Sequence, residues 1–249
     1  ANKPNTITLC NAKGKSLRVI KKSEKLKEKL KEYHLTKKEF FDFKTGQGIS
    51  LNGWMMKPVN FDENKKYPVL MYVYGGPGSQ TVKDSWGGHY MWYQMLCQQG
   101  YIVVSIDNRG TGGRGSEFKK CTYKELGKLE TIDQIEGAKY LANLNYIDNN
   151  KIGIWGWSYG GYMSSLCILK GSKFFNTAIA VAPVTNWRFY DTIYTERYMQ
   201  TPQENPNGYD LNSPIHHVDS LSGHYFLIHG SADDNVHVQN TYEMVNALV

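Results

Sequence analysis

The first candidate catalytic motif is Gly156-Trp157-Ser158-Tyr159-Gly160, which has the pattern Gly-x-Ser-x-Gly. The apolar run Lys151 to Trp155 before it predicts a buried strand, and Tyr162 to Leu169 after it predicts a packed helix. A serine on a strained strand-to-helix turn is a typical acyl-transfer nucleophile, and glycines flank it because side chains there would collide with the strand and helix. We therefore predict that Ser158 is a nucleophile and that the N–H of Tyr159 is an oxyanion donor. An ordinary glycine-rich turn is the alternative.

Such a serine needs a base and an acid that orients the base. In the chain order serine, acid, histidine, the acid follows a later strand. The run Tyr225 to Gly230 predicts that strand, and Asp233 lies in the loop after it. We prefer Asp233 to Asp234 as the acid. The alternative is that this loop only caps the last helix, through Asp234 or Asn235.

The sequence does not supply an obvious base. His237 is the only histidine after Asp233, and it comes four residues later, so both are expected at the start of one helix. His237 is therefore expected to be a surface or supporting residue. The last residues, Met244 to Val249, predict an apolar helix without a cap. We expect the base histidine to lie outside this chain, with one more strand and helix, and these 249 residues alone to be inactive.

Two glycine-rich loops follow predicted strands. Gly75 to Gly78 follows the strand Tyr67 to Tyr74 and occupies the place of an oxyanion loop, where Tyr74 either donates its phenol or only packs. Gly110 to Gly115 matches the dinucleotide pattern G-x-G-x-x-G, with Glu130 as an acid about twenty residues on.

The dinucleotide reading of the second loop is disfavoured because no apolar helix follows it. Arg114 to Lys120 is polar, and the preceding strand is not the first of the sheet. We therefore expect these glycines to form turns, and we expect no cofactor. Asp107 and Arg109, which precede the loop, are expected to form an ion pair beneath the active site.

Composition excludes several classes of function. The net charge is +6, but the first 44 residues hold 13 Lys+Arg and 5 Asp+Glu, so the excess lies in a lysine-rich helix expected between Lys21 and Lys38. Its alternating glutamates indicate a solvated face rather than a nucleic-acid site. The four cysteines show no Cys-x-x-Cys spacing, so no metal is expected. No apolar run approaches the roughly 18 residues that span a membrane.

The order of elements predicts an α/β fold. From Tyr67 onward, apolar strands alternate with helices, as in a doubly wound, mostly parallel sheet. Two hairpins are predicted before it, at residues 6–20 and 39–57. The lysine-rich segment separates them. Residues 1–38 therefore read as the tail of a preceding domain with a linker helix, and residues 39–249 as the main domain.

Together the motifs resemble the prolyl oligopeptidase family of serine peptidases, in its dipeptidyl peptidase IV branch. The motifs that carry this resemblance are Gly156 to Gly161, Val73 to Pro77, Asp107 to Gly110, Ala232 to His237 and, most specifically, Val181 to Met199. The resemblance implies an α/β-hydrolase fold that lacks its C-terminal strand and helix here, preceded by a β-propeller of which only the last hairpin remains. The glutamates that grip the substrate's amino group would lie in that propeller.

The resemblance implies release of N-terminal dipeptides with penultimate Pro or Ala, from peptide substrates. Ser158 would be the nucleophile, Asp233 the acid, and Tyr74 an oxyanion donor beside Tyr159. Asn235 would hold a substrate carbonyl. The residues implied to line the proline site are Tyr159, Val184, Trp187, Tyr190 and Tyr194.

The resemblance further implies a homodimer that is periplasmic, secreted or membrane-anchored. Two alternatives remain open. One is another α/β-hydrolase acyl hydrolase, an esterase or acylaminoacyl peptidase. The other is a non-catalytic, hydrolase-like binding module.

Overall fold

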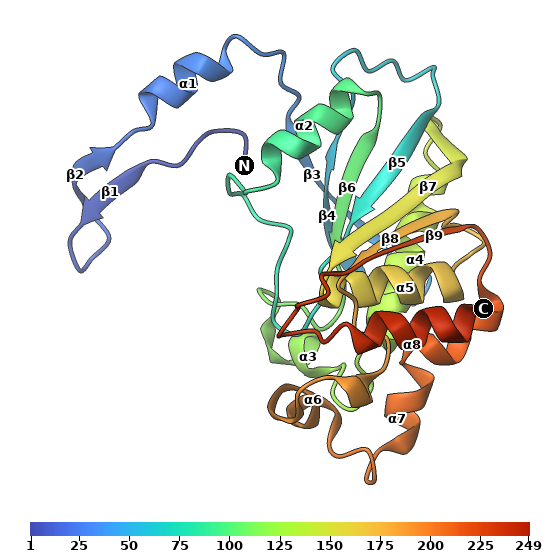
Figure 1. The fold of residues 1–249 in the computed structure, drawn as a ribbon. Coiled ribbons are helices and arrows are strands. Elements are labelled where there is room, and N and C mark those ends of the chain that lie inside the picture. Colours follow the sequence, from blue (N-terminus) through green and yellow to red (C-terminus); the bar gives the residue numbers. More distant parts are fainter.

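The computed structural model describes all 249 residues, and most of them build one domain around a seven-stranded sheet (Figure 1). The first three strands in the sheet pair antiparallel, and the others run parallel. This is the predicted α/β arrangement, in which hairpin 39–57 forms the antiparallel edge. In sheet order the strands are β3 (Lys38–Lys44), β4 (Ser50–Met56), β6 (Ile102–Asp107), β5 (Tyr67–Tyr72), β7 (Ile147–Trp157), β8 (Thr177–Val181) and β9 (His224–Ile228).

Helices cover both faces of the sheet (Figure 1). On one face, α4 (Lys128–Ala142), α5 (Tyr159–Lys170) and α8 (Gln239–Leu248) contribute to a core of 31 buried residues. On the other face, α2 (Tyr90–Gln98) packs in a smaller core with Trp54 and Trp155. Strands such as β6 are buried along their whole length because side chains on both faces are covered.

The segment between β8 and β9 holds short helices that the sequence patterns did not predict. They lie beyond the carboxyl end of the sheet, below it in Figure 1. Side-chain caps start the two α-helices: Asp191 accepts from Tyr194 N–H, and Asn205 accepts from Gly208 N–H. The helices are η1 (Trp187–Phe189), α6 (Thr192–Met199), α7 (Pro206–Leu211) and η2 (Pro214–Ser220).

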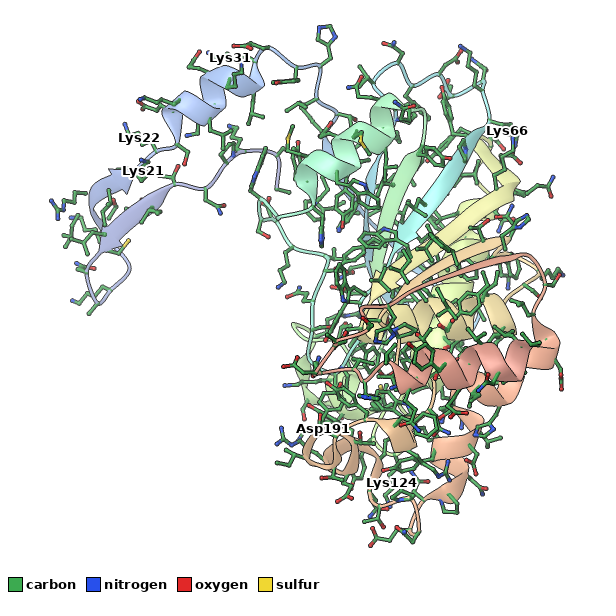
Figure 2. All side chains as sticks on the ribbon, viewed as in Figure 1. Lys21, Lys22, Lys31, Lys66, Lys124 and Asp191 are labelled. Carbon is green, nitrogen blue, oxygen red and sulfur yellow. The ribbon has the colours of Figure 1, made fainter.

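The N-terminal residues form an arm that leaves the domain (Figure 1). Its strands β1 (Ile7–Cys10) and β2 (Ser16–Lys21) pair only with each other, and α1 (Glu24–Leu30) has no buried residue. Figure 2 shows Lys21, Lys22 and Lys31 along this arm, away from the sheet. The predicted hairpin and lysine-rich helix are therefore present, although the helix is much shorter than the segment it was expected to fill.

No helix in the structure is both long enough and apolar enough to cross a membrane.

Candidate active site

Ser158 lies at the turn between β7 and α5, in a strained backbone conformation. Its φ is 57° and its ψ is −118°, a left-handed φ that L-residues rarely adopt. The backbone is fixed on both sides, because Ser158 N–H donates to Val181 O over 2.8 Å and Ser158 O accepts from Tyr162 N–H over 2.9 Å. The side chain is only partly buried. This is the geometry of a nucleophile elbow.

The flanking glycines are required by close backbone contacts, as the sequence predicted. A Cβ added to Gly156 would lie 2.4 Å from Val73 O, and one added to Gly160 would lie 2.1 Å from the same oxygen. At Gly161 a Cβ would lie 2.7 Å from Val181 O. The turn can therefore approach the ends of β5 and β8 only where it carries no side chain.

Tyr74 lies beside the elbow, at the start of the loop after β5. Its ring centroid is 6.0 Å from that of Tyr159. Burial raises the pKa of the Tyr74 phenol, and the phenol of Tyr198 raises it further. Tyr74 therefore keeps its proton at neutral pH and can donate a hydrogen bond. Because the next residue, Gly75, has a φ of 77°, the chain turns sharply away from the strand.

The loop Gly110–Gly115 braces the loop Gly75–Gly78. Gly78 N–H donates to Gly110 O, and Gly112 N–H donates to Ser79 O, both over 2.8 Å. A Cβ on Gly112 would lie 2.8 Å from Gly78 O. The glycines thus form turns and a close loop contact, and the turns were expected from the sequence.

The predicted ion pair between Asp107 and Arg109 is wrong. Arg109 instead pairs with the buried Asp133 of α4, with Nη2 and Oδ1 2.7 Å apart. The Asp107 carboxylate accepts from Thr81 N–H over 2.8 Å and from Val82 N–H over 3.1 Å. β6 ends at Asp107, and Arg109 lies in the turn that follows, so the period of the strand no longer sets its direction and the two side chains meet different partners. Each ties a different segment to the end of β6.

Asp233 lies in the loop after β9, at the same edge of the sheet as Ser158. Its Oδ1 accepts from Asn235 N–H over 3.0 Å and from Val236 N–H over 2.9 Å. Asp234 is exposed. The geometry therefore favours Asp233 as the fixed carboxylate. Neither Asp234 nor Asn235 caps the last helix, because α8 begins later, at Gln239.

The histidines near this loop are bonded elsewhere. His237 is exposed, and its Nδ1 accepts from Gln239 N–H over 3.2 Å. It lies before α8 rather than inside it, contrary to the expectation that it shares a helix start with Asp233. His229 is buried, with Nδ1 2.7 Å from Thr241 Oγ1 and Nε2 2.7 Å from Val236 O. His229 therefore braces the acid loop against α8.

An aromatic cluster borders the elbow, and it contains four of the five residues implied for the proline site: Tyr159, Trp187, Tyr190 and Tyr194. The rings of Trp187 and Tyr194 are stacked at 6.2 Å, and those of Tyr190 and Tyr194 meet edge to face at 5.4 Å. Tyr159 joins the cluster at 5.8 Å from Trp187. Val184, the fifth residue, is buried near them in the main core. Tyr190 Oη donates to Asn235 Oδ1 over 3.1 Å, so the cluster is tied to the acid loop.

Two polar features here were not assigned to this site from the sequence. The Tyr159 hydroxyl donates to Glu130 Oε1 over 2.9 Å, and Glu130 is completely buried. The Asn108 side-chain amide donates to Gly75 O over 3.0 Å and so holds the loop Gly75–Gly78. A partial signal for Glu130 exists in the spacing Gly127-x-x-Glu130, since a glutamate at the third helical position can accept from the N-cap N–H, although glycine lacks the side chain of a full capping box. His, Cys, Asp and Glu side chains form no cluster that could hold a metal ion.

Comparisons with known proteins agree with one another. Residues 89–249 match the prolyl oligopeptidase family. Over 232 residues, 92% of this chain, the sequence is 46% identical to a protein described as a probable dipeptidyl-aminopeptidase B of Paracoccidioides brasiliensis. Over 240 residues it is 42% identical to a dipeptidyl peptidase 4 of Trichophyton equinum.

Solved structures show the same fold. The crystal structure of Porphyromonas gingivalis dipeptidyl peptidase 4 superposes on 99% of this chain with a TM-score of 0.94 and 46% sequence identity. A putative dipeptidyl aminopeptidase IV of Bacteroides ovatus gives 0.90 and 35%. This chain spans 25% and 31% of the length of the two fungal relatives, and 35% of each bacterial chain.

Proposed function

This chain belongs to the prolyl oligopeptidase family, and from that premise we propose that it forms the catalytic part of a serine exopeptidase that releases N-terminal dipeptides. The observation that carries the proposal is the strained elbow of Ser158 beside the aromatic cluster. The elbow supplies an acyl-transfer nucleophile. The cluster supplies a site for a flat, apolar side chain such as the ring of proline.

In the proposed reaction, Ser158 Oγ attacks the carbonyl carbon of the second substrate residue. The developing oxyanion accepts hydrogen bonds from Tyr159 N–H, at the start of α5, and from the Tyr74 hydroxyl. The C–N bond then breaks, and the amine leaves with the proton that Ser158 gave to the general base. Water hydrolyses the resulting ester of Ser158 and returns the hydroxyl.

The other roles follow from the arrangement. Asp233 would orient the general base, because its Oδ1 is held by two backbone N–H groups, while its Oδ2 lies 3.6 Å from His229 Nε2, accepts no hydrogen bond and can accept one from the base. We assign the base to a histidine outside these 249 residues. Asn235, held by Tyr190, would bind a carbonyl of the substrate. Tyr159, Val184, Trp187, Tyr190 and Tyr194 would select proline or alanine.

We also propose that residues 1–38 are the end of a preceding domain and that residues 39–249 are the peptidase domain. The arm supports this division, because its hairpin pairs only with itself and leaves Leu17 61% exposed and Ile20 58% exposed. Such a two-stranded ribbon is marginal unless it packs on more sheet. Assembly of the whole protein as a homodimer remains a prediction of the resemblance.

The activity is tested with the full-length gene product and three chromogenic substrates: a Gly-Pro anilide, the same anilide with an acetylated amino group, and a simple aryl ester. We expect turnover of the free Gly-Pro anilide but not of the acetylated one. We expect kcat/KM for the free anilide to fall by about 10³-fold or more in Ser158→Ala. Fast ester hydrolysis without dipeptide release would favour an esterase. Equal turnover of the acetylated anilide would contradict exopeptidase action.

A further inference from the structure

The carboxyl of Glu130 is buried directly behind the proposed site. Glu130 is the third residue of α4 and has no exposed surface. Its Oε2 accepts from Gly127 N–H, and its Oε1 accepts from the Tyr159 hydroxyl, each over 2.9 Å. No cationic side chain forms an ion pair with it, since the nearby Arg109 pairs with Asp133. A buried carboxyl is costly unless it is hydrogen-bonded, so these two contacts depend on each other.

Tyr159 has two proposed roles, and both require it to be held in place. Its backbone N–H follows Ser158 and faces the oxyanion. Its ring lies between Tyr74, at 6.0 Å, and Trp187, at 5.8 Å. Burial raises the pKa of the Tyr159 phenol well above its usual value, and the Glu130 carboxyl raises it further, so the phenol keeps its proton. The only polar atom of this ring is therefore fixed by Glu130, at the end away from the elbow.

A capping role alone does not account for this arrangement. Capping of Gly127 N–H needs only one oxygen of Glu130, so the other oxygen is left for a different partner. Here the second oxygen accepts from the hydroxyl of Tyr159, so the hydrogen bond links α4 to the first residue of α5. The neighbouring Thr131 shows the purely structural case, because its Oγ1 donates to Gly127 O over 2.5 Å and makes no hydrogen bond to the site.

We propose that Glu130 is a positioning residue for acyl transfer, which holds the Tyr159 hydroxyl and so fixes the Tyr159 ring against the proline site and its N–H against the oxyanion. This inference rests on the proposed function. Small displacements of catalytic groups have large effects on rate, and a ring that moves no longer matches proline. Loss of the carboxyl should therefore lower both the rate and the preference for proline over alanine.

The test compares Gly-Pro and Gly-Ala anilides in the full-length gene product. The variants are Glu130→Met, which keeps the side-chain length without polar atoms, Glu130→Gln, Tyr159→Phe and the double variant Glu130→Met with Tyr159→Phe. Thr131→Val is the matched control at the same helix start. The ratio of kcat/KM for the two substrates is the main readout, because a smaller folded fraction lowers both values equally and leaves the ratio unchanged.

We expect Glu130→Met and Tyr159→Phe each to lower the Pro/Ala ratio by about tenfold, and the double variant to lose no more than either single one. Glu130→Gln should retain most of the ratio, because its amide can still bond to both partners. Thr131→Val should keep the wild-type ratio.

Wild-type ratios in Glu130→Met, or losses that multiply in the double variant, would overturn the inference and leave the proposed function standing. If Glu130→Met does not fold, Tyr159→Phe decides the question, since an unchanged ratio there overturns the inference equally. A wild-type protein that releases no dipeptide would overturn both the function and the inference.

Discussion

Among single residues, the glycines that flank Ser158 matter as much as Ser158 itself, because they carry no Cβ. Ser158 can adopt its strained conformation because Gly156 and Gly160 let the end of β5 come close to the turn. Tyr159 then places one backbone donor at the elbow and one ring in the aromatic cluster. In the proposed site, the nucleophile, an oxyanion donor and part of the specificity site thus come from two consecutive residues.

We therefore expect alanine substitutions at two glycines of β7 to differ in their effect on the free energy of unfolding. Gly156→Ala places a Cβ 2.4 Å from Val73 O, a backbone atom that cannot move aside. We expect this change to lower the free energy of unfolding by at least about 2 kcal/mol. Gly153→Ala is the control, because its nearest neighbour would lie 3.5 Å away, in ordinary contact.

Urea denaturation of both variants beside the wild type measures the difference. The control should stay within about 1 kcal/mol of the wild type. Equal destabilisation by the two substitutions would show that the close approach at the elbow does not constrain residue 156.

At the scale of elements, α4 and α5 meet at a buried acid. Burial raises the pKa of the Glu130 carboxyl from 4.5 to about 8. Tyr159, Tyr162 and Asp133 face it and are buried with it, and Arg109, Cys121 and Tyr194 lie close enough to interact with its charge. The contact between the two helices therefore includes a proton that the unfolded chain releases at a much lower pH.

Stability should consequently fall as pH rises through this window. Between about pH 5 and about pH 8 the folded protein holds the Glu130 proton and the unfolded chain does not. The free energy of unfolding then decreases by up to about 1.4 kcal/mol per pH unit, and the contribution is complete only below the unfolded pKa.

Denaturation curves across this range should show a smaller slope against pH for Glu130→Gln than for the wild type. Glu136→Gln on the same helix is the control. A hydrogen bond from Gly46 N–H lowers the pKa of Glu136, so its titration lies below the window. Parallel slopes for Glu130→Gln and the wild type would contradict the assignment of this proton to Glu130.

The elements also show which features the sequence could predict. The sheet strands, β7 above all, and α5 follow from local apolar patterns, and Gly-x-Ser-x-Gly identified the elbow because the turn needs its glycines within five residues. The predicted pairing of Asp107 with Arg109 was wrong because their actual partners, Thr81 and Asp133, lie on other segments of the chain. The helices α6 and α7 have 8 and 6 residues, too short for a clear period.

At the scale of the whole molecule, the site is assembled at one edge of the sheet from segments far apart in the sequence. Ser158 follows β7, Asp233 follows β9, and the aromatic residues come from the segment between β8 and β9. The parallel register aligns Trp157 with Val181 and Val181 with Ile228, so the carboxyl ends of the three strands lie level. Ligands of open α/β sheets bind at such carboxyl ends.

Whole-molecule features were less accessible from the sequence than the elbow. The hairpin and the lysine-rich segment were predicted and were assigned to a preceding domain, but the direction in which they leave the main domain was not predicted, because it depends on packing rather than on local pattern. The link between Glu130 and Tyr159 was missed for the same reason, since the two residues are 29 positions apart and meet only when α4 packs on α5.

Covalent labelling tests directly whether Ser158 is an activated nucleophile. The full-length gene product is treated with a fluorophosphonate, digested, and mapped by mass spectrometry beside Ser158→Ala. We expect one adduct, on the peptide that contains Ser158, and no adduct in Ser158→Ala. A folded wild-type protein that stays unlabelled at Ser158, or a variant labelled to the same extent, would contradict it.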